Sequence, residues 1–426
     1  MQRPSPRLLL LLPTVTYRTV AFVEAARRLG VEVTVASERP STFEQANPAG
    51  LVTLDFADPA RAAGQARAFA RRHVLQGVVA VDDDTAVVAA AISEELGLRG
   101  NPVAAAAAAR DKHQQRQRLA AAGVAVPRFE LLATAEDPER VARRASYPCV
   151  LKPLRLSASR GVVRADDAAG FVAAFQRLTA ILEEPDVARC GDWARQILVE
   201  EFVPGREVAV EGLVTLGMLT VLAIFDKPDP LEGPFFEETI YVTPSRLAPT
   251  ARQEVAACVQ AAVGALGLRE GPIHAEVRYN DRGAWLIELA ARPIGGRCSA
   301  ALRFTAGEGG TGNGEQQVSL EEIIIRHALG MSIPTIEREV QASGVMMIPV
   351  SGAGVLREVR GVGEARKVPL VEEVVITAHP GQALVPWPEG SRYPGFIFAR
   401  GGTSEAVEAA LRAAHAQLEF LTEPAD

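Results

Sequence analysis

Apolar and polar positions follow two different periods along the first hundred residues. Short apolar runs of strand length are separated by amphipathic stretches of helical length. The expected strands are 8–12, 32–36, 51–55 and 77–81, and the expected helices are 17–29, 59–72 and 85–96. This alternation predicts a doubly wound, Rossmann-like parallel sheet. No G-x-G-x-x-G follows the first strand, which disfavours a dinucleotide-dependent dehydrogenase.

Polar residues occupy the loops after these strands, where sheets of this kind bind ligands. They are Thr14, Thr16 and Tyr17 after the first strand and Asp82, Asp83 and Asp84 after the fourth. The three aspartates fit either a metal or substrate site or a solvated loop with a helix N-cap, and we favour the second.

The middle of the chain mixes strands and helices less regularly. One long Ala-rich helix is expected over 101–122, ended by Gly123. The other expected elements are strands at 129–133, 148–152, 196–202, 207–215 and 219–225, and helices at 138–145, 171–182 and 250–266. The segment 226–247 is acidic, aromatic and rich in Pro, so we predict a long loop there.

The pattern changes again towards the C-terminus. Residues 305–317 are Gly-rich and without pattern, and we expect them to be mobile or disordered. A helix at 318–330 follows. The remaining expected elements are strands at 346–350, 355–359, 371–377, 382–385 and 393–400, and a helix at 404–418. They predict a small α+β lobe beginning near residue 335.

One β-hairpin carries the most informative residues. A three-residue loop, 281–283, would pair Asn280 with Ala284 and thereby place Glu276 opposite Glu288. Alternation along the strands then gives one face to His274, Glu276, Arg278, Leu286, Glu288 and Ala290.

Two carboxylates directly across a ladder lie roughly 5 Å apart and repel each other. A hard divalent cation with phosphate oxygens would relieve that repulsion. Arg292 and the Gly295–Gly296 pair follow at once, so an anion could lie beside the metal. The alternative is a solvated hairpin face with ordinary charges.

A second group of residues fits a nucleotide. Lys152 ends a strand before the Ser-rich loop 157–161, and a strand-end cation under such a loop can hold a polyphosphate, which Lys112 could also reach. The strand end 200–203 offers backbone groups to a purine, and Glu207 offers an acceptor to ribose. Taken singly, each feature also fits an ordinary charged surface.

The order and spacing of these parts resemble the ATP-grasp superfamily over residues 100–305. The N-terminal α/β domain resembles the usual first domain of that family. The last lobe, with GVMMIPVSGAGVLREV and YPGFIFARG, resembles the C-terminal domain of L-amino acid ligases, a group that includes carnosine-synthase-like enzymes.

This resemblance implies a role for each matching residue. The residues expected at ATP are Lys112 and Lys152 at the α- and β-phosphates, Ser157, Ser159 and Gly161 in the closing loop, Glu200, Glu201, Phe202 and Val203 at adenine, Glu207 at ribose, and Lys227 as a further contact. Those expected at the reaction centre are Glu276 and Glu288 as ligands of Mg²⁺ or Mn²⁺, and Arg292 at the acyl phosphate.

His274, beside Glu276, either orients substrate and accepts the amine proton or is a satisfied strand histidine. Two positions depart from the family. Ala290 stands where many relatives have a metal-binding Asn, and Ala158 stands where the loop often has Gly. One metal position is therefore expected to be weaker, and loop closure stiffer.

The function implied is an ATP-dependent carboxylate–amine ligase that makes dipeptides or similar amides through an acyl phosphate. Two alternatives stay open. One is an ATP-grasp enzyme acting on bicarbonate, formate, another non-amino-acid carboxylate or a purine intermediate. The other is an ATP-binding module without turnover. A cationic Arg297 or Arg303 would favour an acidic amino acid, and neither substrate is identified by the sequence.

Composition limits the partners. The chain has 426 residues, a formal net charge of −7 and no dense Lys/Arg block, which disfavours nucleic acid. Its four cysteines form no CxxC pair, which suits a reducing cytoplasm and disfavours a zinc site. No run is long enough for a membrane span or a signal segment. We expect small-molecule partners and leave a homodimer open.

These patterns together predict a multidomain α/β and α+β protein. The expected domains are a Rossmann-like domain at 1–100, an ATP-grasp domain at 101–334 with 124–205 as its nucleotide-covering lobe, and a C-terminal lobe at 335–426.

Overall fold

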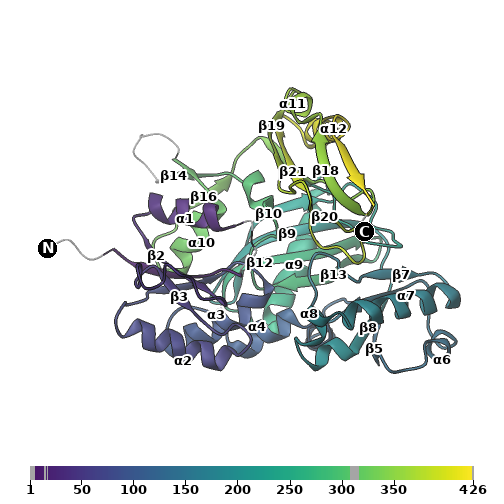
Figure 1. Ribbon diagram of the computed structural model, residues 1–426, viewed down its shortest axis with the longest axis horizontal. Coiled ribbons are helices and arrows are strands. Elements are labelled where there is room, and N and C mark those ends of the chain that lie inside the picture. The colour runs from purple at the N-terminus through teal and green to yellow at the C-terminus, as the bar shows by residue number, and fades with distance from the viewer. Residues whose placement is uncertain (1–4, 14–15, 17, 308–315, 425–426) are drawn as a thin grey trace.

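The computed structural model describes residues 5–13, 16, 18–307 and 316–424. Its elements group around five sheets (Figure 1). No helix in these ranges has the length and apolar character needed to cross a membrane.

The N-terminal sheet is parallel and doubly wound, as the alternation predicted. Its strands are β1 (Arg7–Leu11), β2 (Glu32–Ser37), β3 (Leu51–Thr53) and β4 (Gly77–Ala80), in the order β3-β2-β1-β4. Leu9 and Leu11 of β1 pack against α2 (Pro59–Ala70) and α3 (Asp83–Leu96). Leu8 and Leu10 face α1 (Thr19–Arg28) and α10 (Leu320–Ala328). Burial on both faces explains why β1 is a continuous apolar run.

The long helix predicted over 101–122 is wrong, because it is broken at Asp111. Its two parts are α4 (Val103–Arg110) and α5 (Lys112–Ala121). Asp111 is extended, with φ −101° and ψ 109°, and its carboxylate caps α5 by accepting from the N–H of Gln114 at 3.1 Å. The break places Lys112 at the first residue of a helix, where its N–H donates to the carbonyl of Leu154 at 3.1 Å.

The small lobe has a core of its own. Its sheet has the order β5-β8-β6-β7 and consists of β5 (Phe129–Ala133), β8 (Gln196–Glu201), β6 (Cys149–Pro153) and β7 (Val163–Ala165). Helix α7 (Ala168–Leu182) lies along one face, and α6 (Pro138–Ala142), α8 (Pro185–Ala188) and the 3₁₀ turn Asp192–Arg195 lie around it. Lys152 and Glu200 therefore stand on neighbouring strands near one end of this sheet.

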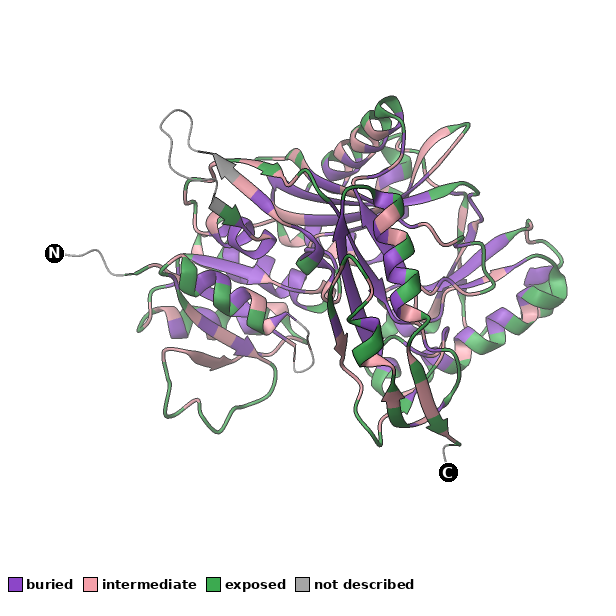
Figure 2. Cartoon of the chain, turned by 90° about the horizontal axis from the view of Figure 1, so that it is seen from above, coloured by how far each residue is buried: buried purple, intermediate pink, exposed green. Residues whose placement is uncertain are grey.

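An eight-stranded sheet forms the centre of the molecule (Figure 2). Its order is β13-β12-β9-β10-β11-β17-β21-β19, with β13 (Gly283–Ala290), β12 (Glu270–Asn280), β9 (Arg206–Thr215), β10 (Met218–Asp226), β11 (Ile240–Thr243), β17 (Ala342–Met347), β21 (Gly395–Gly401) and β19 (Val371–Ile376). Helix α9 (Pro249–Leu266) packs on one face of it, and α12 (Ser404–His415) covers its C-terminal strands.

Strand β11 corrects the prediction that 226–247 is a long loop. This short apolar run pairs with β17 over four residues and joins β10 at Asp226. It therefore links β9 and β10 to the strands β17, β21 and β19 in one sheet. The predicted domain boundaries stay predictions.

The remaining elements lie at the rim. Strands β14 (Phe304–Gly307), β15 (Gln316–Val318) and β16 (Thr335–Arg338) form one small sheet, and β20 (Ala383–Leu384), β18 (Gly354–Arg360) and β22 (Glu419–Glu423) form another, with α11 (Val362–Ala365) nearby. The segment 305–317, predicted to lack structure, begins and ends in paired strands. Residues 308–315, Thr14 and Tyr17 lie outside the described ranges.

Candidate active site

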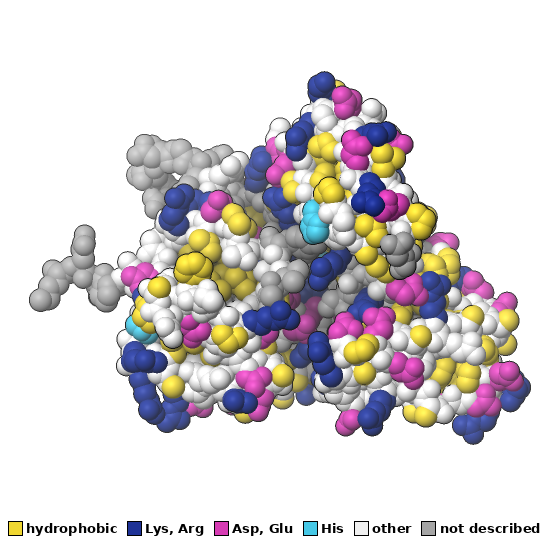
Figure 3. Space-filling model, viewed as in Figure 1, with side chains coloured by type: hydrophobic (Ala, Val, Ile, Leu, Met, Phe, Trp, Pro, Cys, Tyr) yellow, Lys and Arg dark blue, Asp and Glu magenta, His cyan; other side chains and the backbone are white. Residues whose placement is uncertain are grey.

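A cleft with a volume of about 310 Å³ lies where the N-terminal domain, the small lobe, the central sheet and the C-terminal lobe meet. Charged side chains of both signs surround the hollow on the face shown in Figure 3. All the predicted site residues line this cleft except Gly161 and Lys227, which lie immediately behind its wall. Residues distant in sequence thus converge on one site.

The predicted pair of glutamates faces each other, although the predicted turn is wrong. Asn280 pairs with Gly283 across a two-residue loop, one residue tighter than expected. A β-bulge next to Glu276 adds one residue to β13 and restores the register, so Glu276 stands opposite Glu288. The bulge also sends Leu286 to the other face, where it is fully buried, rather than to the face of the glutamates.

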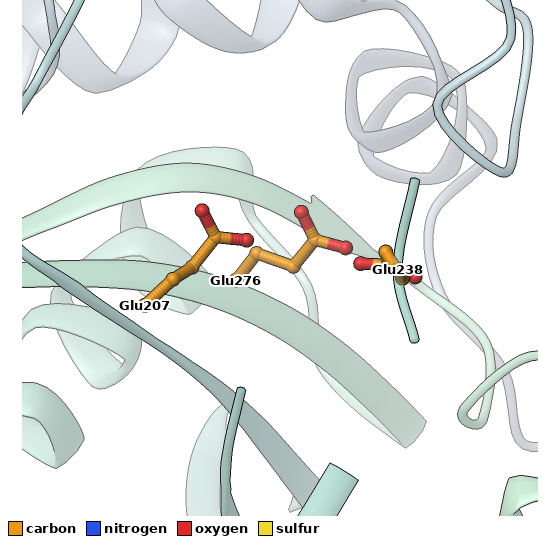
Figure 4. Close-up of side chains that lie close together, drawn as sticks. All are labelled: Glu207, Glu238 and Glu276. Carbon is orange, nitrogen blue, oxygen red and sulfur yellow. The ribbon is translucent and has the colours of Figure 1, made fainter. Parts of the chain in front are cut away.

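Glu276 belongs to a cluster of three carboxylates around one ammonium group. Oxygens of Glu207, Glu238 and Glu276 lie within 4.8 Å of one another (Figure 4). Lys227 Nζ lies 2.8 Å from Glu207 and 3.4 Å from Glu276, and also contacts Glu238. Burial is the main reason that the pKa of Glu276 is raised to about 8. The charges of Glu238 and Glu207 raise this pKa further, whereas the charge of Lys227 lowers it. When ionised, these three carboxylates carry more negative charge than Lys227 and Arg278, the cation on the other oxygen of Glu207, balance, and the donor set fits a divalent cation.

Glu288 connects the glutamate pair to the predicted phosphate-binding lysines. Lys112 Nζ lies 3.0 Å from Glu288 and donates to the carbonyl of Leu156 at 3.0 Å. Both contacts hold the ammonium group of Lys112 between the hairpin and the Ser-rich loop. This position results from the break at Asp111, which sequence reasoning missed.

Lys152 is held by a buried ion-pair network. Its Nζ lies 2.5 Å from one oxygen of Glu200, and Arg116 Nε lies 2.6 Å from the other. Burial works against ionisation of Glu200, but Arg116 and Lys152 outweigh it and hold the pKa of Glu200 below its ordinary value. Both oxygens of Glu200 are thus engaged, and its adenine role stays a prediction. Arg116 carries no motif signal and was missed.

A small apolar slot adjoins the strand end 200–203. It consists of Val150, Phe202, Leu231 and Phe236. The N–H of Phe202 donates to Pro148, and the carbonyl of Val203 accepts from Arg278 at 2.7 Å. Arg278 also donates to Glu207 at 2.8 Å and lies 4.8 Å from the Phe202 ring centroid. A flat aromatic base fits between such walls.

The Ser-rich loop leans on the C-terminal lobe. Trp387 Nε1 donates to the carbonyl of Ala158 at 2.7 Å, and the N–H of Gly161 donates to the carbonyl of Pro388 at 2.8 Å. Ala158 and Ser159 both have φ of 55°, a left-handed conformation that residues with a Cβ adopt only when their surroundings hold them. The C-terminal lobe therefore fixes the shape of this loop.

Arg292 reaches the cleft from the turn after β13. Its Nε donates at 2.9 Å to Asp83, whose same oxygen accepts from Ser157 Oγ at 3.1 Å. Asp83 is half-buried; partial burial works against its ionisation, but Arg292 outweighs this and holds the pKa of Asp83 below the ordinary value. Asp84 instead pairs with Arg110 outside the cleft, and Asp82 caps α3. The three-aspartate loop thus supplies an N-cap, as favoured, and it also places Asp82 and Asp83 in the wall of the cleft.

His274 is hydrogen bonded within the sheet. Its Nδ1 lies 3.2 Å from Glu211, a fully buried carboxylate whose other oxygen accepts from the N–H of Ile294 at 3.0 Å. Burial lowers the pKa of His274, so the neutral ring donates from Nδ1. Nε2 lies 3.9 Å from Glu276. Glu211 therefore orients both the histidine and the turn that carries Arg292.

Arg297 and Arg303 do not reach the cleft. Arg297 lies 3.6 Å from Glu373, and Arg303 lies 3.1 Å from Glu372, both on the C-terminal lobe. The suggestion that these arginines select an acidic substrate is therefore not supported by their positions. Ala290, the departure from the usual Asn, lies in the cleft wall and is buried.

The pKa of Asp82 can be tested through the pH dependence of protein stability. Its pKa is raised to about 6, chiefly by burial, from an ordinary value near 3.8. Its ionised form therefore costs folding free energy once the pH exceeds both values, by at most about 3 kcal/mol. Asp82→Asn keeps the cap, so its stability relative to the parent should rise from pH 4 to pH 6 and then level off.

Urea unfolding at each pH measures this difference. Asp167→Asn, which caps α7 outside the cleft, controls for the amide at a helix N-cap. A stability difference for Asp82→Asn that stays constant across this range would contradict the expectation.

Three protein-family models match this chain, in the same order as its lobes. Residues 23–100 match the ATP-grasp N-terminal domain, 145–301 the ATP-grasp domain, and 346–423 the L-amino acid ligase C-terminal domain 2. The chain belongs to the ATP-grasp superfamily. The predicted resemblance, over both the ATP-grasp region and the last lobe, is confirmed.

Individual relatives cover different shares of this ATP-grasp protein. Alanine–anticapsin ligase of Bacillus subtilis is 32% identical over 215 residues, 47% of this chain and 45% of the relative. Human carnosine synthase 1 is 30% identical over 286 residues, 63% of this chain and 34% of the relative. The aligned regions thus span less than half of each of these two curated relatives.

Two solved structures match over nearly the whole chain. An L-amino acid ligase from Bacillus licheniformis superposes with a TM-score of 0.81 at 28% identity, covering 99% of this chain and 100% of that one. A carboxyaminoimidazole ribonucleotide synthase from Aspergillus clavatus, complexed with ATP, has a TM-score of 0.71 at 18% identity, covering 97% and 99%. The second likeness shows the fold alone.

Proposed function

We propose that this chain is an ATP-dependent carboxylate–amine ligase that forms an amide, such as a dipeptide, and releases ADP and phosphate. The observation that carries the proposal is the convergence of Glu276, Glu288 and Arg292 in one cleft that an apolar slot also lines. The likeness to an L-amino acid ligase over the full chain supports amino acids as substrates.

We place ATP and Mg²⁺ in the cleft, and the chemistry of its donors supports this. Glu276 and Glu288 would hold Mg²⁺, or Mn²⁺, with Glu207 and Glu238 close by. The metal would supply positive charge at the phosphate oxygens during transfer. Lys112 and Lys152 would hold the α- and β-phosphates, and Ser157, Ser159 and Gly161 would close over them. The ATP complex of the Aspergillus clavatus enzyme has the same fold.

We place the adenine in the slot beside β8. The Phe202 ring would pack against it, and Glu201 and the N–H of Val203 would meet the edge of the base. That N–H donates to no other group in the described part of the chain. Glu207 would accept from ribose, and Lys227 would steady both Glu207 and Glu238. Glu200 contributes by fixing Lys152.

The reaction would proceed in two steps at the other end of the cleft. A carboxylate oxygen attacks the γ-phosphorus to give an acyl phosphate and ADP. The amine nitrogen then attacks the acyl carbon, the carbon–oxygen bond to phosphate breaks, and the amine loses a proton. Arg292 would hold the acyl phosphate and the developing oxyanion. His274, neutral and fixed by Glu211, would orient substrate or accept the amine proton.

Phosphate release from ATP in the presence of paired amino acids tests the proposed function. We expect release that depends on both a carboxylate and an amine, together with a new amide detected by mass spectrometry. Release with bicarbonate or a purine intermediate alone would favour the rival enzyme class. ATP binding without release under any pairing would favour a non-catalytic module. The small-molecule partners, a homodimer and a cytoplasmic location stay predictions.

Lys152→Met tests the nucleotide site. Methionine has a similar length but no charge, so the variant leaves Glu200 paired with Arg116 and removes the strand-end cation. We expect ATP affinity to fall by about one to two decades, because a contact with a charged group is worth ~1.5–3 kcal/mol. Calorimetry with ATP and Mg²⁺ measures this.

The matched control is Lys367→Met, which lies on the C-terminal lobe outside the cleft. Lys112→Met should weaken ATP binding less than Lys152→Met. Unchanged ATP affinity in the Lys152 variant would remove that lysine from the phosphate site.

A further inference from the structure

Arg18 is a buried cation at the cleft without a carboxylate partner. It immediately precedes α1, is 6% exposed, and lines the cleft. Its guanidinium donates to the carbonyl of Pro293 at 3.1 Å, and no Asp or Glu of the described residues lies within 4.0 Å of it. The buried arginines Arg116 and Arg278 both have carboxylate partners. A buried charge without a counter-ion is costly, so Arg18 lacks an anion that the folded chain does not provide.

The neighbourhood of Arg18 increases that need. Arg292 Nη1 donates to the same carbonyl of Pro293 at 3.0 Å, so two guanidinium groups converge there. Asp83 balances Arg292. Two buried carboxylates, Glu211 and Glu321, act on Arg18 from beyond ion-pair distance, and Glu211 is engaged by His274 and Ile294. Neither forms an ion pair with Arg18, so its guanidinium can take an anionic ligand.

Tyr393 provides a second, independent indication. It comes from the C-terminal lobe, is 8% exposed and lines the same cleft. Its hydroxyl has no hydrogen-bond partner in the described structure, although its ring packs on Trp387 at 4.8 Å between centroids. A buried hydroxyl without a hydrogen-bond partner destabilises the fold, and a ligand that accepts from it would remove that cost. The cleft wall also includes Ile294, Cys298 and Met347, and the carboxylates of Glu238 and Glu237 lie near enough to act on the Tyr393 hydroxyl.

We propose that Arg18 and Tyr393 bind a substrate carboxylate that is not the one activated by ATP. This inference rests on the proposed ligase function. A guanidinium fork matches a carboxylate with two parallel hydrogen bonds, and a neutral tyrosine donates one more. The site would hold a carboxylate beside the reacting centre, because Arg18 and Arg292 share one carbonyl.

Two sources supply such a group. One is the α-carboxylate of an amino acid that acts as the amine, which lies two bonds from the attacking nitrogen. The other is a second carboxylate on the acid that is activated. The geometry favours the first, because the site adjoins the position of Arg292, where the acyl carbon would be attacked. The amine substrate is then an α-amino acid rather than a simple amine.

The experiment compares amines that differ only at the carboxylate. Phosphate release is measured with the full-length protein, ATP and Mg²⁺. Each of the twenty L-amino acids serves in turn as the acid, and L-alanine, L-alaninamide or ethylamine serves as the amine. The amino acids are then screened as the amine, and the one that gives the fastest phosphate release replaces L-alanine, with its amide in place of L-alaninamide. Arg18→Met, Arg18→Lys and Tyr393→Phe are compared with the parent, and Arg303→Met serves as a control outside the cleft.

We expect Arg18→Met to raise the KM for the amino-acid amine about 10- to 100-fold, with the KM for ATP unchanged. The parent's preference for the amino acid over its amide should collapse in the same variant. Arg18→Lys should recover part of that preference, and Tyr393→Phe should raise the same KM about 3- to 10-fold. If Arg18→Met instead lost activity only with acid substrates that carry a second carboxylate, the site would bind the acid substrate.

Unchanged discrimination in Arg18→Met and Tyr393→Phe would overturn the inference. If Arg18→Met does not fold, as judged by circular dichroism, Arg18→Lys and Tyr393→Phe carry the test alone. Absence of amide formation by the parent protein would overturn the proposed function instead. Turnover by the parent with unaltered variant kinetics would overturn only the carboxylate site.

Discussion

Glu288→Gln is expected to fold normally and to lose amide formation by two decades or more. The substitution keeps the volume and hydrogen-bonding capacity of the side chain but removes one negative charge. In the structure Glu288 faces Glu276 across the hairpin and lies 3.0 Å from Lys112 Nζ. A glutamine can still accept from Lys112, whereas it is a poor ligand for Mg²⁺. Losing one preorganised charge contact at phosphoryl transfer costs ~3 kcal/mol.

The measurement is the rate of amide formation over a series of Mg²⁺ concentrations. Glu254→Gln makes the same chemical change on the exposed side of α9, next to the hairpin but away from the cleft, and should leave the rate unchanged. Circular dichroism verifies the fold of both variants. Turnover near the parental level at saturating Mg²⁺ would remove Glu288 from the metal site.

Arg292→Lys is expected to bind ATP almost normally and yet to form amide at least two decades more slowly. A lysine at this position keeps the positive charge and can still pair with Asp83, but it cannot grip two oxygens with a planar fork. If those oxygens belong to the acyl phosphate and the oxyanion, the contact is stronger in the transition state than in the ground state. The loss then falls on turnover rather than on ATP affinity.

Calorimetry with ATP and single-turnover amide formation separate the two effects. Arg303→Lys is the matched control, because Arg303 pairs with Glu372 outside the cleft. A proportional loss of ATP affinity would make Arg292 a triphosphate ligand. Normal affinity and normal turnover together would make it structural and displace the acyl phosphate from our assignment.

The N-terminal sheet shows how far local pattern reaches. Every residue of Leu8–Leu11 is apolar because β1 is covered on both faces. This pattern can be recognised in the sequence without knowing which helices cover the strand. Strand β11 shows the limit. It is four residues long within a Pro-rich segment, and most of its pairing is with β17, about a hundred residues later, with one further pair to β10. Short elements that depend on distant pairing carry little local signal.

The hairpin shows a correct conclusion reached through a wrong intermediate. The turn is one residue shorter than predicted, and an unpredicted bulge adds one residue to β13. The two differences cancel, so Glu276 still pairs with Glu288. A bulge is set by how the strand fits its neighbours, so neither residue identity nor turn chemistry announced it. The break at Asp111 has a similar origin. A helix would continue through this Ala-rich sequence, but docking against Leu154 and capping by Asp111 end it there.

By itself the sequence determined the doubly wound first domain, the facing glutamates, the strand-end Lys152 and the order of parts that marks the ATP-grasp superfamily. These features depend on the types of residues that lie close together in the sequence, or on the order in which motifs follow one another, and both can be read from the sequence directly. Only the tertiary structure decided that Glu238 joins the glutamate cluster, that Glu200 holds two cations, and that Arg18 and Tyr393 meet at one cleft. Those relations join residues far apart in sequence, and the charge balance of a buried group depends on everything packed around it.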